Sequence, residues 1–237
     1  MKQLKTILLL LFIASSSIKS QVLISLIFGE VLNTDKVEFG LAGGMNRSYI
    51  NSISGSEGMN NFDIGFYFHV LLKNNSYLST GVHVKSNVGA TGMATYPVGD
   101  ASFDDVYKDG TLTKKIPVFY VPILFHKRIK KRWYVEAGPQ LGLIYNATDI
   151  FEINNYGGEL KYSRDVQEEY KRIDAGIMGG VGYKFSKQIK SESIGIQYYY
   201  GLVDVSKNPD LDIYNSSIYF FIRIPIGAGV HAKKDLD

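Results

Sequence analysis

Apolar and polar residues alternate along most of the chain, and the clearest example is residues 133–145, WYVEAGPQLGLIY. Successive side chains of a β-strand point to opposite faces, so this stretch would have one apolar face with an aromatic residue at each end. The other face would be small or polar and would carry Glu136. A soluble β-sandwich can bury such an apolar face in its core, but aromatic ends around an aliphatic middle are also typical of a strand that crosses a bilayer within a β-barrel.

The same two-residue period recurs in eight segments. Each is close to the roughly 9–11 residues with which a tilted strand crosses the hydrocarbon layer. An even number of strands can close an antiparallel barrel and leaves no unpaired edge in lipid. Pro117 and Pro122 lack the backbone N–H that a strand ladder uses, so we expect the fourth segment to be bulged or irregular. The predicted strands cover residues 37–46, 62–72, 77–85, 116–125, 133–145, 173–183, 194–202 and 217–226.

The connections between these segments alternate between short and long. Outer-membrane barrels have short periplasmic turns and long external loops, whereas a sandwich or a lipocalin has no reason to sort its connections in this way. Lysine and arginine crowd the short connection 127–132, while aspartate and glutamate populate the long ones. The pattern therefore predicts an all-β fold, an eight-stranded antiparallel up-and-down transmembrane β-barrel in the cell outer membrane. The short connections are residues 73–76, 127–132 and 186–193, and the long ones are residues 50–61, 90–115, 146–171 and 204–215.

The two ends of the chain complete this picture. Residues 1–20 begin with lysines, continue with an apolar run and end in a serine-rich stretch, which is the order of a secretory signal peptide. The apolar run, residues 7–14, is too short to span a bilayer as a helix. We therefore expect an exported chain whose residues 21–36 form a periplasmic N-terminal segment, as a helix, a plug or an extra strand. Residues 37–227 would form the barrel, and residues 228–237 would form a periplasmic C-terminal tail.

Composition narrows the class of protein further. The chain has 237 residues and no cysteine, which excludes a disulfide framework, a thiolate metal site and a lipid-modified N-terminal cysteine. The formal net charge of +3 is small and gives no reason to expect a nucleic-acid partner. The mean hydropathy is close to zero, which suits a transmembrane barrel as well as a soluble protein, because only alternate residues of a barrel strand face lipid.

The barrel segments also contain glycine-rich and aromatic motifs in a definite order. They are FGLAGGMNRS (residues 39–48), FDIGFYF (62–68), IPVFYVPILF (116–125), WYVEAGPQLG (133–142), DAGIMGGVGY (174–183) and YYYGLVDV (198–205). In this order they resemble the PorT-like outer-membrane β-barrel proteins of Bacteroidetes-type Gram-negative bacteria, over nearly the whole mature chain. None of the motifs is catalytic.

The resemblance implies an eight-stranded up-and-down barrel in the outer membrane. The namesake of the family is linked to export of proteins to the cell surface. The resemblance therefore also implies a structural or accessory role in the cell envelope, with envelope or secretion proteins as partners in addition to outer-membrane lipid. There is one departure, because many outer-membrane barrels end on an aromatic residue that assists assembly, whereas residues 227–237 follow the last predicted strand here.

Charged residues on the faces predicted to point inward form the candidate site. An eight-stranded barrel is just wide enough for its own side chains, and buried charges need partners. We expect a structural salt-bridge network that fills the lumen, and a gated proton or ion path is the alternative. Because the first and last strands must pair, we also expect Glu38 to lie near Arg223. The predicted lumen residues are Glu38, Asp63, His69, His83, Lys85, Glu136, Arg172, Asp174 and Arg223.

His69 and His83 share one face of a predicted hairpin with its turn near residues 74–75, as diagonal neighbours about 7–8 Å apart at Cα. Two imidazoles can hold a metal if a carboxylate joins them, but with only two candidate ligands visible we predict no metal and no cofactor. No nucleophile–base spacing stands out, so we predict a protein without catalytic activity. The alternatives are a carrier of small solutes or lipids that uses the lumen, and an outer-membrane hydrolase that uses His69, His83 or Asp174.

Overall fold

The computed structural model describes residues 32–155 and 158–226. The predicted signal peptide at residues 1–20 and tail at residues 228–237 lie outside the described residues, as does most of the segment 21–36. No helix in the described part of the chain is long and apolar enough to cross a membrane. The elements in chain order are β1 (Val37–Ile50), β2 (Glu57–Leu71), β3 (Ser76–Ala94), α3 (Ala101–Tyr107), β4 (Thr111–Arg128), β5 (Trp133–Ile144), β6 (Thr148–Asn155), β7 (Gly158–Asp165), the 3-10 turn η2 (Gln167–Glu169), β8 (Ile173–Lys184), β9 (Ser193–Gly201) and β10 (Asn215–Pro225).

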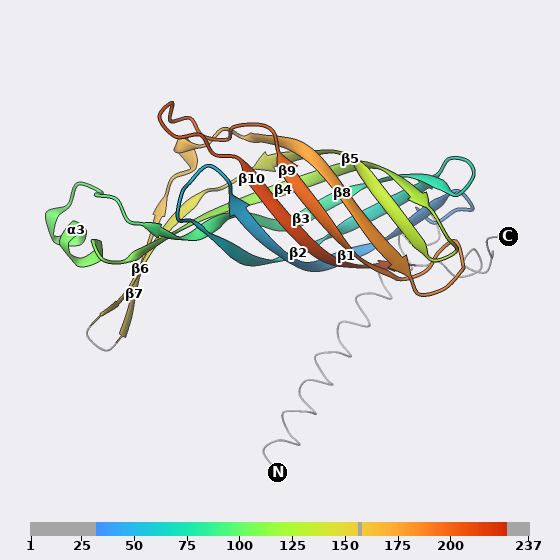
Figure 1. Ribbon diagram of the computed structural model, residues 1–237, viewed down its shortest axis with the longest axis horizontal. Coiled ribbons are helices and arrows are strands. Elements are labelled where there is room, and N and C mark those ends of the chain that lie inside the picture. Colours follow the sequence, from blue (N-terminus) through green and yellow to red (C-terminus); the bar gives the residue numbers. More distant parts are fainter. Residues whose placement is uncertain (1–31, 156–157, 227–237) are drawn as a thin grey trace, which may run out of the picture.

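Eight of these strands form a closed antiparallel barrel (Figure 1). Neighbours in the order β1, β2, β3, β4, β5, β8, β9 and β10 pair with each other, and β1 pairs with β10, which joins the first strand to the last. In that closing pair Gly40 lies opposite Pro225, and Ile50 lies opposite Asn215. The prediction of an eight-stranded up-and-down barrel is therefore confirmed. A closed wall of this kind leaves no strand edge in the hydrocarbon layer.

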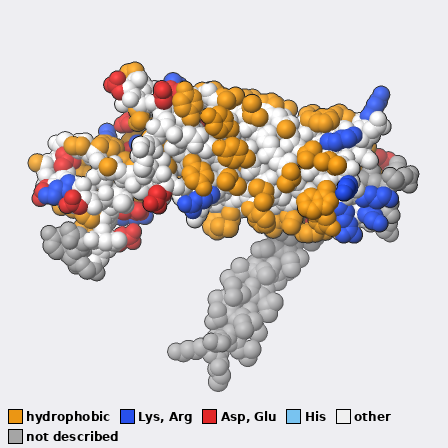
Figure 2. Space-filling view, in the orientation of Figure 1, with side chains coloured by type: hydrophobic (Ala, Val, Ile, Leu, Met, Phe, Trp, Pro, Cys, Tyr) orange, Lys and Arg blue, Asp and Glu red, His pale blue; other side chains and the backbone are white. Residues whose placement is uncertain are grey.

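The outer surface of the wall is apolar. Along β5, Trp133, Leu141 and Leu143 are 53%, 50% and 46% exposed, whereas Tyr134 and Glu136 are only 1% and 2% exposed. Figure 2 shows a broad band of hydrophobic side chains across the visible face of the barrel, between an end rich in lysine and arginine and an end that carries acidic side chains. An exposed apolar band of this extent is suited to acyl chains rather than to water.

The inward faces combine glycine with large aromatic side chains. A Cβ atom at Gly182 would lie 2.1 Å from Cζ of Tyr134, the residue opposite it on β5. A Cβ atom at Gly40 would lie 2.5 Å from Cε1 of Tyr67, the residue opposite it on β2. Both tyrosines are almost completely buried. Glycine at these two positions therefore leaves the space that a tyrosine ring fills, which keeps a narrow barrel closely packed.

The irregularity of the wall lies on a different strand from the one predicted. β4 is one continuous strand of 18 residues, although it contains Pro117 and Pro122. Extra residues belong to the neighbouring β3, where the register against β4 shifts between His83 and Ser86 and again between Ala90 and Met93. A bulge inserts one residue into one strand of a pair and disrupts the ladder locally. The expectation of a bulged fourth strand is thus wrong, because β3 and not β4 carries the bulges.

Three of the long connections differ from the prediction, and the second, predicted at residues 90–115, covers only residues 95–110 and contains α3. The first, predicted at residues 50–61, is a turn at residues 51–56, because β1 and β2 continue past the apolar band. The third, predicted at residues 146–171, contains a hairpin instead of a loop, because β6 pairs with the end of β4 and β7 pairs with β6. This hairpin and α3 project beyond the end of the barrel (Figure 1). We refer to α3, β6 and β7 together as the extension.

Aromatic side chains hold the extension together. The ring of Phe103 on α3 stacks on that of Tyr107, with centroids 4.5 Å apart. It also contacts the rings of Phe151 on β6 and Tyr162 on β7, at centroid distances of 5.5 and 4.6 Å. Asp100 caps α3 by accepting hydrogen bonds from two backbone N–H groups of the first turn. The extension is therefore a packed unit, and its apolar residues continue the core of the barrel.

Candidate functional site

The structure places most of the predicted lumen residues inside the barrel. Lys85 and Arg172 are exposed, so their assignment to the lumen is wrong. Lys85 lies in the bulge of β3, opposite Ile64, and the extra residue there interrupts the alternation. Arg172 precedes the first residue of β8 and so lies outside its inward face. The buried residues of the predicted set are Glu38, Asp63, His69, Glu136, Asp174 and Arg223, and His83 is partly buried.

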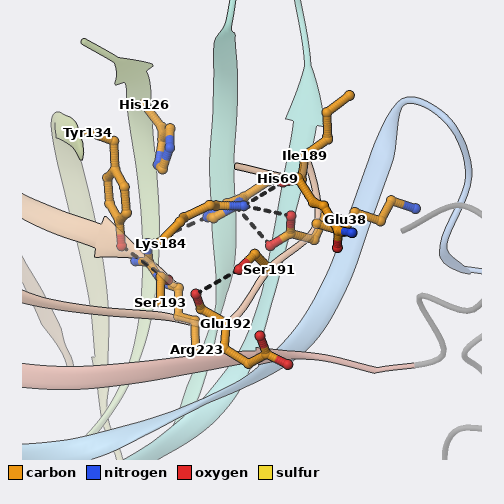
Figure 3. Close-up of polar contacts among 12 residues, drawn as sticks. Glu38, His69, His126, Tyr134, Lys184, Ile189, Ser191, Glu192, Ser193 and Arg223 are labelled. Carbon is orange, nitrogen blue, oxygen red and sulfur yellow. Dashed lines mark hydrogen bonds and ion pairs between the residues drawn. The ribbon is translucent and has the colours of Figure 1, made fainter. Parts of the chain in front are cut away.

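Glu38 is the centre of a buried cluster near the short turns of the barrel (Figure 3). Its Oε2 atom accepts a hydrogen bond from Nζ of Lys184 at 2.9 Å, and its Oε1 atom accepts one from the hydroxyl of Tyr67 at 2.8 Å. Nδ1 of His69 lies 3.5 Å from the same carboxylate. Lys184 also donates to the backbone carbonyl of Ile189 at 2.6 Å. The ion pair of Glu38 and Lys184 is therefore completed by further hydrogen bonds on both sides.

A second buried carboxylate, Glu136, lies next to this cluster. Nη1 of Arg223 donates to its Oε2 atom at 2.9 Å, and Nε2 of Gln197 donates to its Oε1 atom at 2.6 Å. Nδ1 of His126 lies 3.1 Å from Oε2. The rings of His69 and His126 have centroids 4.7 Å apart and join the two clusters. Two carboxylates thus face one lysine and one arginine, which gives the charge balance that a buried network needs.

The predicted pair of Glu38 and Arg223 is not formed. β1 and β10 do pair, but Arg223 lies opposite Ala42 and not opposite Glu38. Each residue has a partner across the lumen instead, because Glu38 meets Lys184 on β8 and Arg223 meets Glu136 on β5. The stagger of the strands decides which side chains lie at the same level of the lumen. The pairing prediction is wrong because it considered only which strands are neighbours. It did not consider the position of each side chain along the barrel axis.

The prediction also misses four residues of these clusters, Lys184, His126, Gln197 and Tyr67. Lys184 follows Gly182 on the inward face of β8, so extending the alternation by one step would identify it. His126 follows Leu124 on the inward face of β4 in the same way. Gln197 lies on a face predicted to point inward but is uncharged, and nothing in the sequence marks its buried hydrogen bond.

The two predicted neighbours His69 and His83 are separated in the structure. His69 lies opposite Ser79, whereas His83 lies opposite Gly65. The register between these positions is continuous and differs from the predicted one by two residues, because Tyr67 lies opposite Gly81 and not opposite His83. Nδ1 of His83 lies 2.5 Å from Oδ1 of Asp63, so this histidine belongs to a different cluster. The interpretation of His69 and His83 as diagonal neighbours is therefore wrong.

A different set of residues brings possible metal ligands together. Ligand atoms of His69, His126 and Glu136 lie within 4.8 Å of one another. The surrounding charge opposes a cation there, because Glu136 already accepts hydrogen bonds from Arg223 and Gln197. Nη1 of Arg223 also lies 3.5 Å from Nε2 of His69. A divalent ion would lie beside a guanidinium in a space of low dielectric, so we interpret the cluster as a salt-bridge network.

Asp174 forms a further network in the lumen. Its Oδ2 atom accepts hydrogen bonds from the hydroxyl of Tyr120 at 2.7 Å and from Nδ2 of Asn215 at 3.0 Å. Its Oδ1 atom accepts one from the hydroxyl of Tyr199 at 2.7 Å. Polar networks and an apolar core together fill the lumen along the described strands. The apolar core on the side of the long connections includes Val88, Leu112, Ile116, Val118, Ile144 and Phe151.

A last network ties the extension to the end of the barrel. Nζ of Lys114 lies 2.7 Å from Oδ2 of Asp149, which also accepts a hydrogen bond from the hydroxyl of Tyr96 at 2.8 Å. Nη1 of Arg164 donates to the same hydroxyl at 3.1 Å. Burial and the neighbouring Asp149 carboxylate raise the pKa of Tyr96. A cavity of about 510 Å³ opens beside this network, and its lining includes Ile53, Met93, Tyr96, Leu112, Lys114 and Leu211.

Solved structures of other outer-membrane proteins resemble this chain in fold. The attachment invasion locus protein Ail of Yersinia pestis is 12% identical over 79% of this chain and 97% of its own, with a TM-score of 0.42. Neisserial surface protein A is 10% identical over 79% of this chain and 96% of its own, with a TM-score of 0.41. OprG of Pseudomonas aeruginosa is 9% identical over 80% and 96%, with a TM-score of 0.35. None of the curated proteins matches the sequence.

A family model decides the classification. The model of the outer membrane protein beta-barrel domain matches residues 28–207, which is well over half of the chain. This range contains seven of the eight barrel strands described above. The chain therefore belongs to the outer membrane protein beta-barrel domain family and is an outer-membrane protein.

Proposed function

We propose that this protein is a non-conducting, non-catalytic barrel that holds the extension in position for a protein partner at the cell surface. It would act as a structural or accessory component of envelope or protein transport. The proposal rests on the contrast between the lumen of the barrel and the extension. The lumen is filled with side chains, whereas a well-packed extension stands clear of the wall (Figure 1).

The packing of the lumen supports a barrel that does not conduct. Tyr120, Tyr134, Met178 and Tyr199 are among the most deeply buried side chains of the described chain. A solute that passed them would have to separate the buried ion pairs. Removing one partner from such a pair costs about 3–5 kcal/mol, because the other charge stays buried and uncompensated. This cost disfavours both a gated ion path and a carrier that uses the lumen.

The extension offers a surface that a protein can recognise. β7 is the outermost strand of the described sheet and pairs with β6 alone, so its other edge presents backbone N–H and C=O groups. Such an edge can accept a strand from another chain. Leu160 and Tyr162 are exposed on this strand. Ion pairs of Lys161 with Glu152 and of Arg164 with the neighbouring η2 turn help to fix the shape of the hairpin.

The sequence resemblance supports the accessory role. The namesake of the PorT-like family is linked to export of proteins to the cell surface, and an exposed binding surface on an inert barrel suits such a task. The hydrolase alternative receives no support from the described geometry. His69, His83 and Asp174 belong to three separate networks, so they cannot act together on one bond.

Crosslinking in intact outer membranes tests the proposal. A variant in which a short glycine–serine linker replaces residues 148–165 lacks β6 and β7 but keeps all eight barrel strands. We expect the wild-type chain to crosslink to a protein partner and this variant to lose that partner. The variant K161Q breaks one ion pair of the hairpin and keeps both strands, so it should retain the partner.

Two further measurements complete this test. Both variants should show the heat-dependent gel mobility of a folded barrel, which separates loss of binding from loss of folding. In planar bilayers the wild-type protein should give no conductance steps. A partner that remains crosslinked after removal of residues 148–165, or porin-like steps from the wild-type protein, would contradict the proposal.

Binding of a small amphipathic solute at the mouth of the barrel is a second candidate function. The cavity of about 510 Å³ favours it, because Met93, Leu112 and Leu211 give it an apolar wall beside the polar groups of Lys114 and Tyr96. Native mass spectrometry of the purified protein should then detect a bound small molecule. The variant L211W narrows the cavity and should lose this molecule. A wild-type protein that carries no additional mass after mild extraction would contradict this function.

A further inference from the structure

The short-turn end of the barrel concentrates positive charge on one rim. Arg128 is buried and donates to three backbone carbonyl groups of the turn at residues 185–192. Lys127 donates to a backbone carbonyl group of the turn at residues 72–75. These contacts hold both turns against the end of β4, so that three turns share the rim. The exposed cations of these turns are Lys73, Lys130, Lys131, Arg132 and Lys187, and Figure 2 shows lysine and arginine side chains gathered at this end.

Little negative charge balances these cations. The acidic side chains exposed beside these turns, within the described residues, are Asp35 and Glu192. Lys130, Lys131 and Arg132 form no ion pair with any other residue of the described chain. Arg132 instead donates a hydrogen bond to a neutral hydroxyl. The turn between β4 and β5 therefore presents three adjacent cations to its surroundings.

This positive charge lies at the level of an aromatic girdle. Ile129, Trp133 and Phe185 are all exposed on the outer surface beside the turns. The rings of Trp133 and Tyr183 are in contact, with centroids 5.1 Å apart, and Nη1 of Arg132 donates to the hydroxyl of Tyr183 at 2.8 Å. Exposed aromatic rings at the end of an apolar barrel wall mark the depth of the lipid headgroups. The guanidinium of Arg132 is thus held at the depth of the phosphate groups.

We propose that Lys130, Lys131 and Arg132 bind the phosphodiester group of an anionic phospholipid, whose acyl chains lie against Trp133. A guanidinium offers a planar fork of donors that matches phosphate oxygens, and the two lysines add charge at the same depth. A zwitterionic phospholipid brings its own cation to this rim and leaves the charge of the protein unbalanced. The net negative headgroup is therefore the one that the rim selects.

The only tryptophan of the chain makes the test direct, because Trp133 adjoins Arg132. The folded protein is reconstituted into phosphatidylcholine vesicles that contain the same small mole fraction of brominated phosphatidylglycerol or of brominated phosphatidylcholine. We expect the brominated phosphatidylglycerol to quench Trp133 with an apparent association constant at least about threefold higher, since each cation near a headgroup adds attraction. The difference should shrink at high ionic strength, because salt screens exposed charges.

Two matched variants test whether the lipid preference depends on the cations of this rim or on cations elsewhere in the protein. K130Q/K131Q/R132Q should lose the preference, and K108Q/K161Q/K207Q, which removes three cations near the long connections, should keep it. Heat-dependent gel mobility checks that both variants fold. Equal quenching by the two lipids in the wild-type protein, or a preference that persists in K130Q/K131Q/R132Q, would overturn the proposal. Loss of the preference on adding inorganic phosphate at constant ionic strength would indicate a site for the free anion and would also overturn it.

Discussion

Nζ of Lys184 lies 2.9 Å from Oε2 of Glu38, although 146 positions separate the two residues in the sequence. The pair joins β8 to β1, which are not neighbours in the wall. Arg223 and Glu136 join β10 to β5 in the same way. The lumen therefore adds bonds between distant parts of the wall to the hydrogen bonds between adjacent strands.

Replacing Lys184 with methionine should destabilise the folded barrel by about 3–5 kcal/mol, because it leaves the carboxylate of Glu38 buried without its cation. The double variant E38Q/K184M removes both charges and should recover most of that loss. Urea unfolding in lipid vesicles, followed by the fluorescence of Trp133, measures both effects. Equal destabilisation of the single and double variants would contradict a direct ion pair.

Charge exchange distinguishes the two possible partners of Arg223. The variant E136R/R223E should recover part of the stability that R223E alone loses, because Arg223 and Glu136 are 2.9 Å apart. The variant E38R/R223E should recover nothing, because Glu38 and Arg223 have separate partners. The same unfolding measurement applies to all of these variants. Recovery in E38R/R223E and not in E136R/R223E would support the pairing expected from the sequence.

Two glycines of β8 should respond differently to the same substitution. Gly182→Ala should cost about 1–3 kcal/mol of unfolding free energy, because its Cβ atom would overlap the ring of Tyr134 and overpacking is destabilising. Gly179→Ala is the matched control, since the nearest atom to its Cβ would be 3.8 Å away. Chemical unfolding in vesicles compares them. Similar losses at both positions would show that the tyrosine ring is not the cause.

Asp204 should make the connection between β9 and β10 sensitive to acid. Its Oδ1 atom accepts hydrogen bonds from the backbone N–H groups of Ile213 and Ser206, and its Oδ2 atom accepts one from Lys171 at 2.6 Å. Burial alone would raise the pKa of this carboxyl. The hydrogen bonds outweigh burial and lower the pKa of Asp204 below its ordinary value. The ionised form is therefore the one that the folded connection prefers.

The direction of the pH effect follows from this shift. A pKa that is lower in the folded state than the unfolded value of about 3.9 stabilises the fold above that value, and the stabilisation is lost as the pH falls through the folded pKa. Hydrogen-exchange protection factors of residues 202–214 should thus be constant near neutral pH and decrease below about pH 4. D204N should already be less protected at neutral pH. Protection that does not change in acid would contradict this role.

The alternation of residue types predicts the wall because lipid outside and a packed lumen inside impose opposite demands on successive side chains. It does not predict which lumen charges meet. Glu38 and Arg223 lie on adjacent strands but at different levels, and their partners come from β8 and β5. One extra residue in β3 is enough to turn Lys85 outward. Register and bulges depend on contacts between strands, which a pattern along one strand does not contain.

The extension is hidden from sequence analysis for a related reason. β7 reads GELKYSRD, a mostly polar stretch in which Leu160 and Tyr162 are the only large apolar residues, because it lies beyond the lipid. Its stability comes from residues far away in the chain, such as Phe103, whose ring lies 4.6 Å from that of Tyr162. A short hairpin of this kind cannot be told from a loop until its partners are known.

The pairing of β1 with β10 has a consequence for biogenesis. The circle of barrel strands is complete only when β10 meets β1. Any shorter nascent chain would expose open strand edges, which hydrocarbon does not tolerate. Insertion can therefore be completed only after β10 has been synthesised, and the factors that escort this polypeptide have to keep the earlier strands apart until then.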